Sequence, residues 1–203
     1  MKESVVFTYG RFNPPHLGHK MMIEEMMKLN KKVVVVVSHS QDKKKNPLAV
    51  ADKIKILKTW FPKLDVRASS KTTPIAKIAE NFAEDSVMVV GEDRGTTIHK
   101  VTPKNSIQSI AKRYGLSENV VKSKKFKVGN NIKLPVSSFT FIKQQKKIIK
   151  RPPGAPSATK ARNAARTGKI ATFRNLTGYN NEKIIKKIRG SPKSLRRNNL
   201  NIL

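Results

Sequence analysis

The chain has 203 residues, of which 37% are hydrophobic, and it contains no cysteine. These values exclude a disulfide-rich scaffold and a thiolate metal site, and the longest apolar run, residues 33–37, is too short to span a bilayer. The length and composition indicate one α/β domain with a modest core, which we expect to be cytoplasmic because the N-terminus has no secretory apolar region.

The formal net charge is +30, and it is unevenly distributed. Residues 1–100 carry 18 basic and 11 acidic side chains, a net +7, whereas residues 101–203 carry 25 basic and 2 acidic ones, a net +23. Such a field attracts nucleic acid, nucleotides or anionic lipid. The alternative is a charge that serves solubility in general.

Apolar runs alternate with helical patterns through the first half of the chain. Five consecutive valines at residues 33–37 are typical of a strand that is buried on both faces of a parallel sheet. The order β-α-β-α-β-α-β predicts a Rossmann-like, doubly wound parallel sheet. We expect strands at 4–9, 32–38, 64–68 and 86–90, and helices at 17–30, 50–61 and 74–83.

The second half has weaker patterns. We expect a helix at 106–114, one or two strands within 124–142, and a rigid loop at 151–156. Ser157 is a suitable N-cap for a helix that Gly168 ends, and a further helix is expected at 182–189. These patterns predict an α/β domain over residues 1–176 and a basic C-terminal helix and tail over 177–203.

The stretch GRFNPPHLGH, residues 10–19, lies between the first strand and the first helix. In open parallel sheets, ligands bind at this position, and a helix N-terminus favours anions. His16 and His19 share one face of a helical turn, where a polyphosphate would favour their protonated, donating form. Two histidines at this spacing also suit a metal, although only His39 and His99 remain as further histidine ligands.

This stretch resembles the signature of the HxGH nucleotidylyltransferase superfamily and is closest to the archaeal-type nicotinamide mononucleotide adenylyltransferases. Three later segments occur where that family has related ones: NPL at 46–48, GEDR at 91–94, and SATKAR at 157–162, which matches S-x-T-x-x-R. The hydroxyls and amides at such a helix start bind phosphate oxygens, and Arg162 can act as a bidentate clamp. The resemblance implies the HUP-type nucleotidyltransferase fold.

The resemblance also implies functional residues, with Mg²⁺ carried by the nucleoside triphosphate rather than held in a protein cage. His16 and His19 would contact the α- and β-phosphates, and the S-x-T-x-x-R residues the β- and γ-phosphates. The implied catalytic residues are His16, His19 and Arg162. The implied nucleotide-binding residues are Gly10, Arg11, Phe12, Gly18, Gly91, Asp93, Arg94, Ser157, Thr159 and Lys160.

The expected reaction is transfer of AMP, or alternatively CMP, from ATP or CTP to a small phosphate-ester acceptor, and nicotinamide or nicotinate mononucleotide is the acceptor that the resemblance favours. Residues 69–82 have no Trp to stack on a nicotinamide ring. Pantetheine-phosphate adenylyltransferases and cytidylyltransferases share HxGH, so other acceptors stay open.

A second hypothesis is a non-catalytic protein that binds nucleic acid or a particle through its basic half, on a nucleotidyltransferase scaffold. Viruses and phages encode relatives of this superfamily, so the location would then be a host cell or virion. Residues 125–151 mix Lys with Phe and Ile but lack a clean helical face, which argues against membrane docking. Many relatives form homo-oligomers, and the sequence shows no interface.

Overall fold

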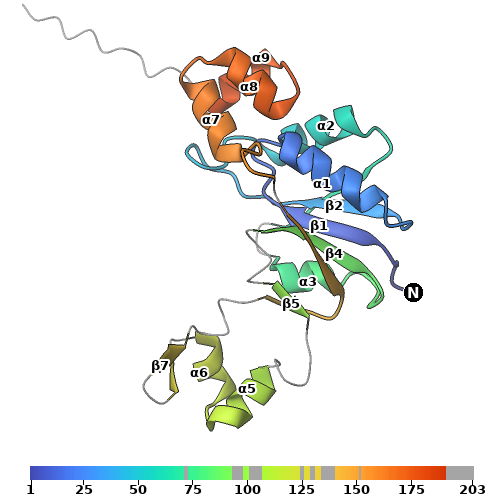
Figure 1. Cartoon of the computed structure of the whole chain (residues 1–203), viewed down its shortest axis with the longest axis vertical. Coiled ribbons are helices and arrows are strands. Elements are labelled where there is room, and N and C mark those ends of the chain that lie inside the picture. The colour runs from blue at the N-terminus through green and yellow to red at the C-terminus, as the bar shows by residue number, and fades with distance from the viewer. Residues whose placement is uncertain are drawn as a thin grey trace, which may run out of the picture.

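The computed structural model describes residues 1–70, 73–92, 98–100, 107–123, 126–128, 131–133, 140–150 and 152–190. Its central sheet has five parallel strands in the order β3-β2-β1-β4-β9 (Figure 1). The chain runs outward from β1 to β3 and then places β4 on the other side of β1, which confirms the predicted doubly wound sheet. The strands are β1 (Val6–Gly10), β2 (Val33–Val37), β3 (Asp65–Ala68), β4 (Val87–Gly91) and β9 (Gln145–Ile149).

The five valines of β2 show how the sheet is covered on both faces. Alternate side chains of a strand point to opposite faces. Val35 and Val37 pack with apolar residues of α1 and α2, whereas Val34 and Val36 pack with those of α3. Helices therefore lie on both faces of the sheet (Figure 1). Their bounds are α1 (Leu17–Met27), α2 (Val50–Trp60) and α3 (Ile75–Ala79).

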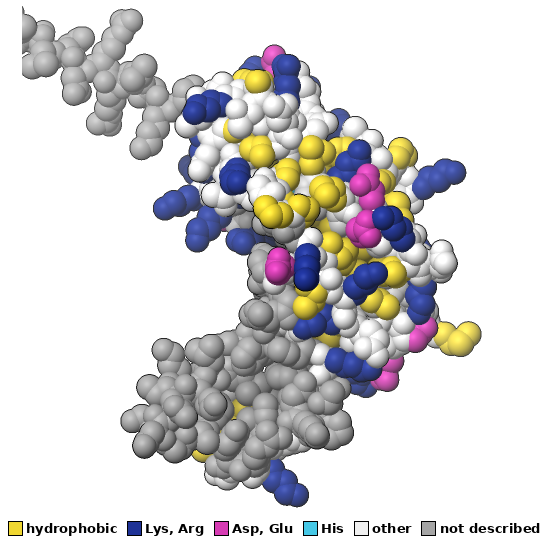
Figure 2. Space-filling view, viewed as in Figure 1, with side chains coloured by type: hydrophobic (Ala, Val, Ile, Leu, Met, Phe, Trp, Pro, Cys, Tyr) yellow, Lys and Arg dark blue, Asp and Glu magenta, His cyan; other side chains and the backbone are white. Residues whose placement is uncertain are grey.

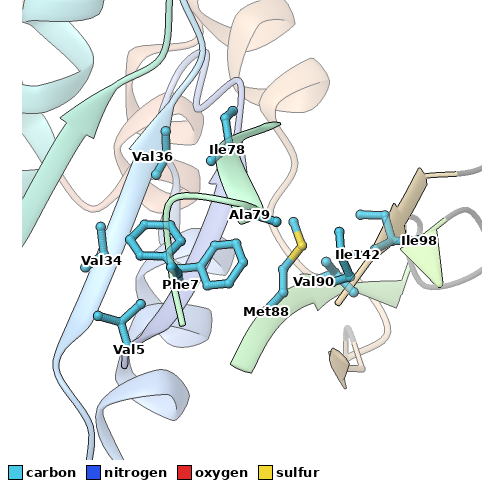
Figure 3. Packing of buried hydrophobic residues seen from close by; sticks show 11 residues of the cluster. Val5, Phe7, Val34, Val36, Ile78, Ala79, Met88, Val90, Ile98 and Ile142 are labelled. Carbon is cyan, nitrogen blue, oxygen red and sulfur yellow. The ribbon is translucent and has the colours of Figure 1, made fainter. Parts of the chain in front are cut away.

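Figure 3 shows the apolar cluster on the α3 face. Phe7 of β1 stacks on Phe82 with ring centroids 4.5 Å apart. Ile98 and Ile142 extend the cluster beyond β4. They belong to a separate parallel pair, β5 (Ile98–Lys100) and β8 (Thr140–Ile142).

Three helices follow the sheet and pack against each other: α7 (Ala158–Arg166), α8 (Ile170–Thr177) and α9 (Glu182–Arg189). They enclose Phe173 and Ile185 together with Leu48 of the β2–α2 loop and Ile56 of α2. The C-terminal helices are thus fixed to one end of the sheet layer (Figure 1). The expected helices at 157–167 and 182–189 are present, and α8 was not predicted.

The chain between β4 and β9 carries short elements. Here α5 (Ile107–Tyr114), α6 (Glu118–Ser123) and the antiparallel pair β6 (Phe126–Val128) and β7 (Asn131–Lys133) are found. The strands expected within 124–142 are therefore present, but none of them joins the central sheet, whose fifth strand is β9. No helix in the described ranges is long and apolar enough to cross a membrane.

Candidate active site

The candidate site lies at the carboxyl edge of the central sheet. The neighbouring strands β1 and β4 end at Gly10 and Gly91. After β1 the chain continues to β2 on one side of the sheet, and after β4 it continues toward β9 on the other side. β9 ends at Ile149 on the same edge, and residues 152–157 lead into α7. Ligands of open α/β sheets bind at such a switch point. The fold therefore brings the two sequence motifs, at residues 10–19 and 157–162, to one place.

The loop after β1 has an unusual backbone conformation. Phe12 adopts a positive φ of 48°, and the Asn13–Pro14 peptide bond is cis. The Phe12 ring folds back onto Gly10, where an added Cβ would lie only 2.9 Å from the ring. Gly10 therefore makes room for this aromatic ring, and Phe12 is a buried packing residue of the loop.

Asn13 ties this loop to the loop after β2. Its side-chain amide donates to the carbonyl oxygen of Leu48 at 2.9 Å, and its side-chain oxygen accepts from the Leu48 amide at 2.9 Å. Asn13 is only 2% exposed, so both bonds are shielded from water. This pairing explains why the NPL segment lies beside the histidine loop. Asn13 was not among the expected site residues.

The two histidines stack at the start of α1. Their ring centroids are 3.7 Å apart with 30° between the planes, and the His19 ring also lies 4.6 Å from that of Phe12. His16 is the N-cap residue, and its backbone N–H donates to Nδ1 of His19 at 3.3 Å. Because Nδ1 of His19 accepts, a neutral His19 carries its ring proton on Nε2. The predicted shared face of the two histidines is thus present.

Contacts between α1 and the segment before α7 join the two motifs. A Cβ added to Gly18 would lie 3.1 Å from the His16 ring and 3.2 Å from the carbonyl oxygen of Pro156. Arg162 Nη1 donates to the carbonyl oxygen of Asn13 at 2.6 Å, and its Nη2 donates to Thr159 Oγ1 at 3.1 Å. Arg162 therefore points from α7 toward the histidine loop.

The site is cationic. Burial lowers the pKa of the Arg162 guanidinium below its usual value, and the nearby charges of Arg166 and Arg11 lower it further, while Asp42 acts in the opposite direction. An arginine remains protonated under these conditions, so the positive charges repel each other until an anion joins them. An anionic ligand between Arg11 and Arg162 would relieve this repulsion.

The N-terminus of α7 has the expected cap. Ser157 is the N-cap residue, and its Oγ accepts from the backbone N–H of Lys160 at 3.2 Å. Thr159 and Lys160 are exposed in the first turn, on the helix that carries Arg162. The first amides of a helix lack intrahelical partners and attract anions, so this turn suits a phosphate group.

Two further side chains support the site and were not predicted. Lys53 is fully buried, and its Nζ donates to the carbonyl oxygens of Ser38 and Ser40 just after β2. Burial lowers the pKa of Lys53 to about 8. Tyr179 donates from its hydroxyl to the carbonyl oxygen of Pro15 at 3.2 Å. Such backbone acceptors leave no signal in the sequence.

The remaining expected site residues differ in their placement. Gly91 is half-buried at the end of β4, and Arg11 is exposed. Asp93 and Arg94 lie outside the described residues. Within the described ranges, no three His, Asp or Glu side chains gather as a metal site.

A model of the family described as cytidylyltransferase-like matches residues 7–163, which is most of the chain. The chain belongs to the cytidylyltransferase-like family. This membership confirms the expected superfamily and the expected class of enzyme, a nucleotidyltransferase. No curated protein matches the sequence significantly.

Solved structures resemble this cytidylyltransferase-like chain in fold. Thermotoga maritima TmcAL, bound with alpha-thio ATP, is 14% identical with a TM-score of 0.50, and the match covers 91% of this chain but 55% of TmcAL. A putative nicotinate-nucleotide adenylyltransferase from Vibrio parahaemolyticus is 15% identical (TM-score 0.47; coverage 93% and 97%). Nicotinic acid mononucleotide adenylyltransferase from Plasmodium falciparum, complexed with NaAD, is 14% identical (TM-score 0.49; coverage 92% and 94%).

Proposed function

We propose that this protein transfers AMP from ATP to the phosphate group of a small acceptor and releases pyrophosphate. One observation carries the proposal: the hydrogen bond from Arg162 to the carbonyl oxygen of Asn13 places the α7 turn beside the histidine pair. A triphosphate between them would meet donors from two sides. ATP is the first triphosphate to test, because TmcAL, which shares the fold, is bound with an ATP analogue.

The reaction needs positioning and charge stabilisation rather than a base. An ionised phosphate oxygen of the acceptor forms a bond to the α-phosphorus, while the bond from that phosphorus to the bridging oxygen breaks and pyrophosphate leaves. Negative charge builds up on the transferring group and on the pyrophosphate. Fixed donors that face this charge lower the barrier.

The proposed roles follow from the geometry. His19 donates from Nε2 to a non-bridging oxygen of the α-phosphate, since its Nδ1 is engaged by the His16 amide. His16 supports that ring by stacking and holds the start of α1. On the other side, Arg162 and the first turn of α7 hold the β- and γ-phosphates.

Mg²⁺ would arrive with the triphosphate and would offset part of its negative charge. The described side chains at the site are cations, histidines and hydroxyls rather than a set of carboxylates. This lining suits a Mg²⁺ ion that is carried by the triphosphate and is not held in a cage of protein ligands. The nearby carboxylate, Asp42, accepts from the backbone amides of Lys44 and Lys45. These donors and the Asn46 amide lower the pKa of Asp42 to about 2. Asp42 is therefore engaged in shaping its own loop.

We propose nicotinate or nicotinamide mononucleotide as the first acceptor to test, and phosphopantetheine as the second. The test measures pyrophosphate released from ATP or CTP with each acceptor, in the presence of Mg²⁺. Release that requires one acceptor and prefers ATP is the expected result. The absence of release with every pair would overturn the proposal.

A variant separates this site from a contaminating activity. His19→Ala should lower turnover by at least about 100-fold, because it removes a donor that faces the developing charge. Lys77→Ala, an exposed position on α3, is the matched control and should retain full activity. Circular dichroism should show the same folded spectrum for both variants. Full activity of the His19 variant would refute its role.

A further inference from the structure

A basic groove lies beside the candidate site, and the proposed transfer reaction uses none of its side chains. It is a hollow of about 860 Å³ between residues 41–52, α7 and the end of α9. Four cations line it, Arg166, Lys186, Lys187 and Arg189, and Asp52 is the one acid among the described lining residues. Figure 2 shows Lys and Arg side chains around the end of the molecule that α7 and α9 form.

The two arginines of this groove are held in place by backbone carbonyl groups. Arg166 Nη2 donates to the carbonyl oxygens of Lys43 and Lys44 at 3.0 and 2.6 Å. Arg189 Nε donates to the carbonyl oxygen of Ala165 at 2.7 Å. Fixed guanidinium groups lose little side-chain entropy when they bind an anion. The groove is thus prepared for negative groups before any partner arrives.

The described lining of the groove carries more cations than acids. Asp52 pairs with Lys187 at 2.7 Å, which leaves an excess of three positive charges in the lining. Residues 152–190 contain nine basic residues and one acidic residue, and residues 191–203 add Lys193, Arg196 and Arg197 with no acid. The chain that follows Gly190 therefore adds positive charge. A partner with many negative charges is required for complementarity.

We infer that this groove binds the phosphodiester backbone of a nucleic acid. A surface groove lined by four cations suits a chain of phosphates, and release of condensed counterions drives such binding. The described lining includes no aromatic side chain on which bases could stack, so contact is with the backbone and tolerates any sequence. Arg166 lies one helical turn after Arg162 on α7, so a bound strand passes next to the triphosphate site.

The test measures binding of fluorescein-labelled single-stranded RNA, duplex RNA and duplex DNA to the full chain by fluorescence anisotropy across a salt series. Wild-type protein should bind at least one of them, with an affinity that falls steeply as salt rises. Lys186→Ala with Lys187→Ala should weaken binding about tenfold or more and reduce the salt slope by about 1.5, as expected for two lost phosphate contacts.

The control is Lys28→Ala with Lys77→Ala, which removes the same charge from exposed positions outside the groove. It should leave affinity and slope almost unchanged. Equal loss in both double variants would show attraction by net charge alone and would overturn the inference. So would absence of wild-type binding at low salt, or equally tight binding of polyglutamate, which would indicate an acidic protein partner. If the groove variant unfolds, Lys186→Glu alone supplies the same comparison.

Discussion

Arg162 and Asn13 are 149 positions apart in the sequence, yet the guanidinium of the first donates to the carbonyl oxygen of the second at 2.6 Å. This bond connects α7 to the cis-proline loop after β1, and it does so at the edge of the sheet where phosphates are proposed to bind. The same guanidinium reaches Thr159 with its other terminal nitrogen. The planar guanidinium meets these two partners through two different nitrogens whose spacing is fixed.

Replacing the Arg162 guanidinium with a lysine ammonium keeps the positive charge but removes the fork, so this substitution tests the geometry apart from the charge. Arg162→Lys should lower pyrophosphate release by about 100-fold and raise KM for ATP, because a single ammonium nitrogen lacks the fixed fork that reaches Asn13, Thr159 and a phosphate at once. The free energy of unfolding should fall by about 1–2 kcal/mol from the lost charged hydrogen bond. Steady-state kinetics and urea unfolding measure the two effects. Arg174→Lys, exposed on α8, should change neither, and wild-type kinetics at position 162 would contradict the assigned role.

Asn13 offers a test of how the two loops depend on each other. Asn13→Ala leaves the buried amide and carbonyl groups of Leu48 without their side-chain partners. The expected loss is about 2–4 kcal/mol in the free energy of unfolding, since each unsatisfied buried group is costly. Chemical denaturation measures this loss, and Asn175→Ala, exposed on α8, serves for comparison. If the two variants are equally stable, the paired bonds contribute nothing.

Gly18 lies in a tight contact, which predicts a kinetic defect without a large loss of stability. A methyl group at this position meets the His16 ring and the Pro156 carbonyl oxygen at 3.1 and 3.2 Å, so both must shift by a few tenths of an ångström. Alanine also favours the helix by about 1 kcal/mol, which offsets the crowding. We expect kcat to fall about tenfold while the melting temperature changes little. Unchanged kcat would show that the histidine geometry tolerates the shift.

Burial of Lys53 predicts a dependence of stability on pH. Its pKa is about 8 in the folded protein against an ordinary 10.5, so between these values the unfolded chain binds the extra proton. Stability therefore rises with pH across this window, by at most about 1.4 kcal/mol per pH unit for one proton. Below about pH 8, Lys53 is protonated in the folded protein as well, so the full cost of burying its charge lowers the free energy of unfolding. Lys53→Met removes the titrating group, and its free energy of unfolding should lack this rise when urea unfolding is measured across the window. Parallel curves for both proteins would contradict the assignment.

The sequence predicted the elements whose pattern is set locally. The valines of β2 must be apolar on both faces because helices cover both, and this burial leaves an unbroken apolar run. β9 escaped prediction because it is an edge strand, where Lys147 and Ile148 are exposed and give no apolar alternation. The short helix α8 has few buried side chains, so its pattern was equally weak.

At the candidate site, the types of the functional residues were predictable from the sequence. The hydrogen bonds that hold these residues in place were not. Histidines, glycines and a capped helix start have sequence signals, and His16, His19 and Ser157 lie as those signals suggest. The bonds that join the motifs end on carbonyl oxygens of Asn13 and Pro15, which every residue possesses. Only the long-range course of the chain determines which carbonyl oxygen meets which donor.

The order of the strands in the sheet has a consequence for synthesis of the protein. β1 to β4 come from the first 91 residues, whereas β9 and α7 come from residues 145–166. On the ribosome, the histidine loop therefore emerges well before the helix that completes it. A nascent chain lacks the second wall of the proposed phosphate site until α7 has emerged. A nucleotide bound between both walls would therefore stabilise the finished chain in preference to any earlier intermediate.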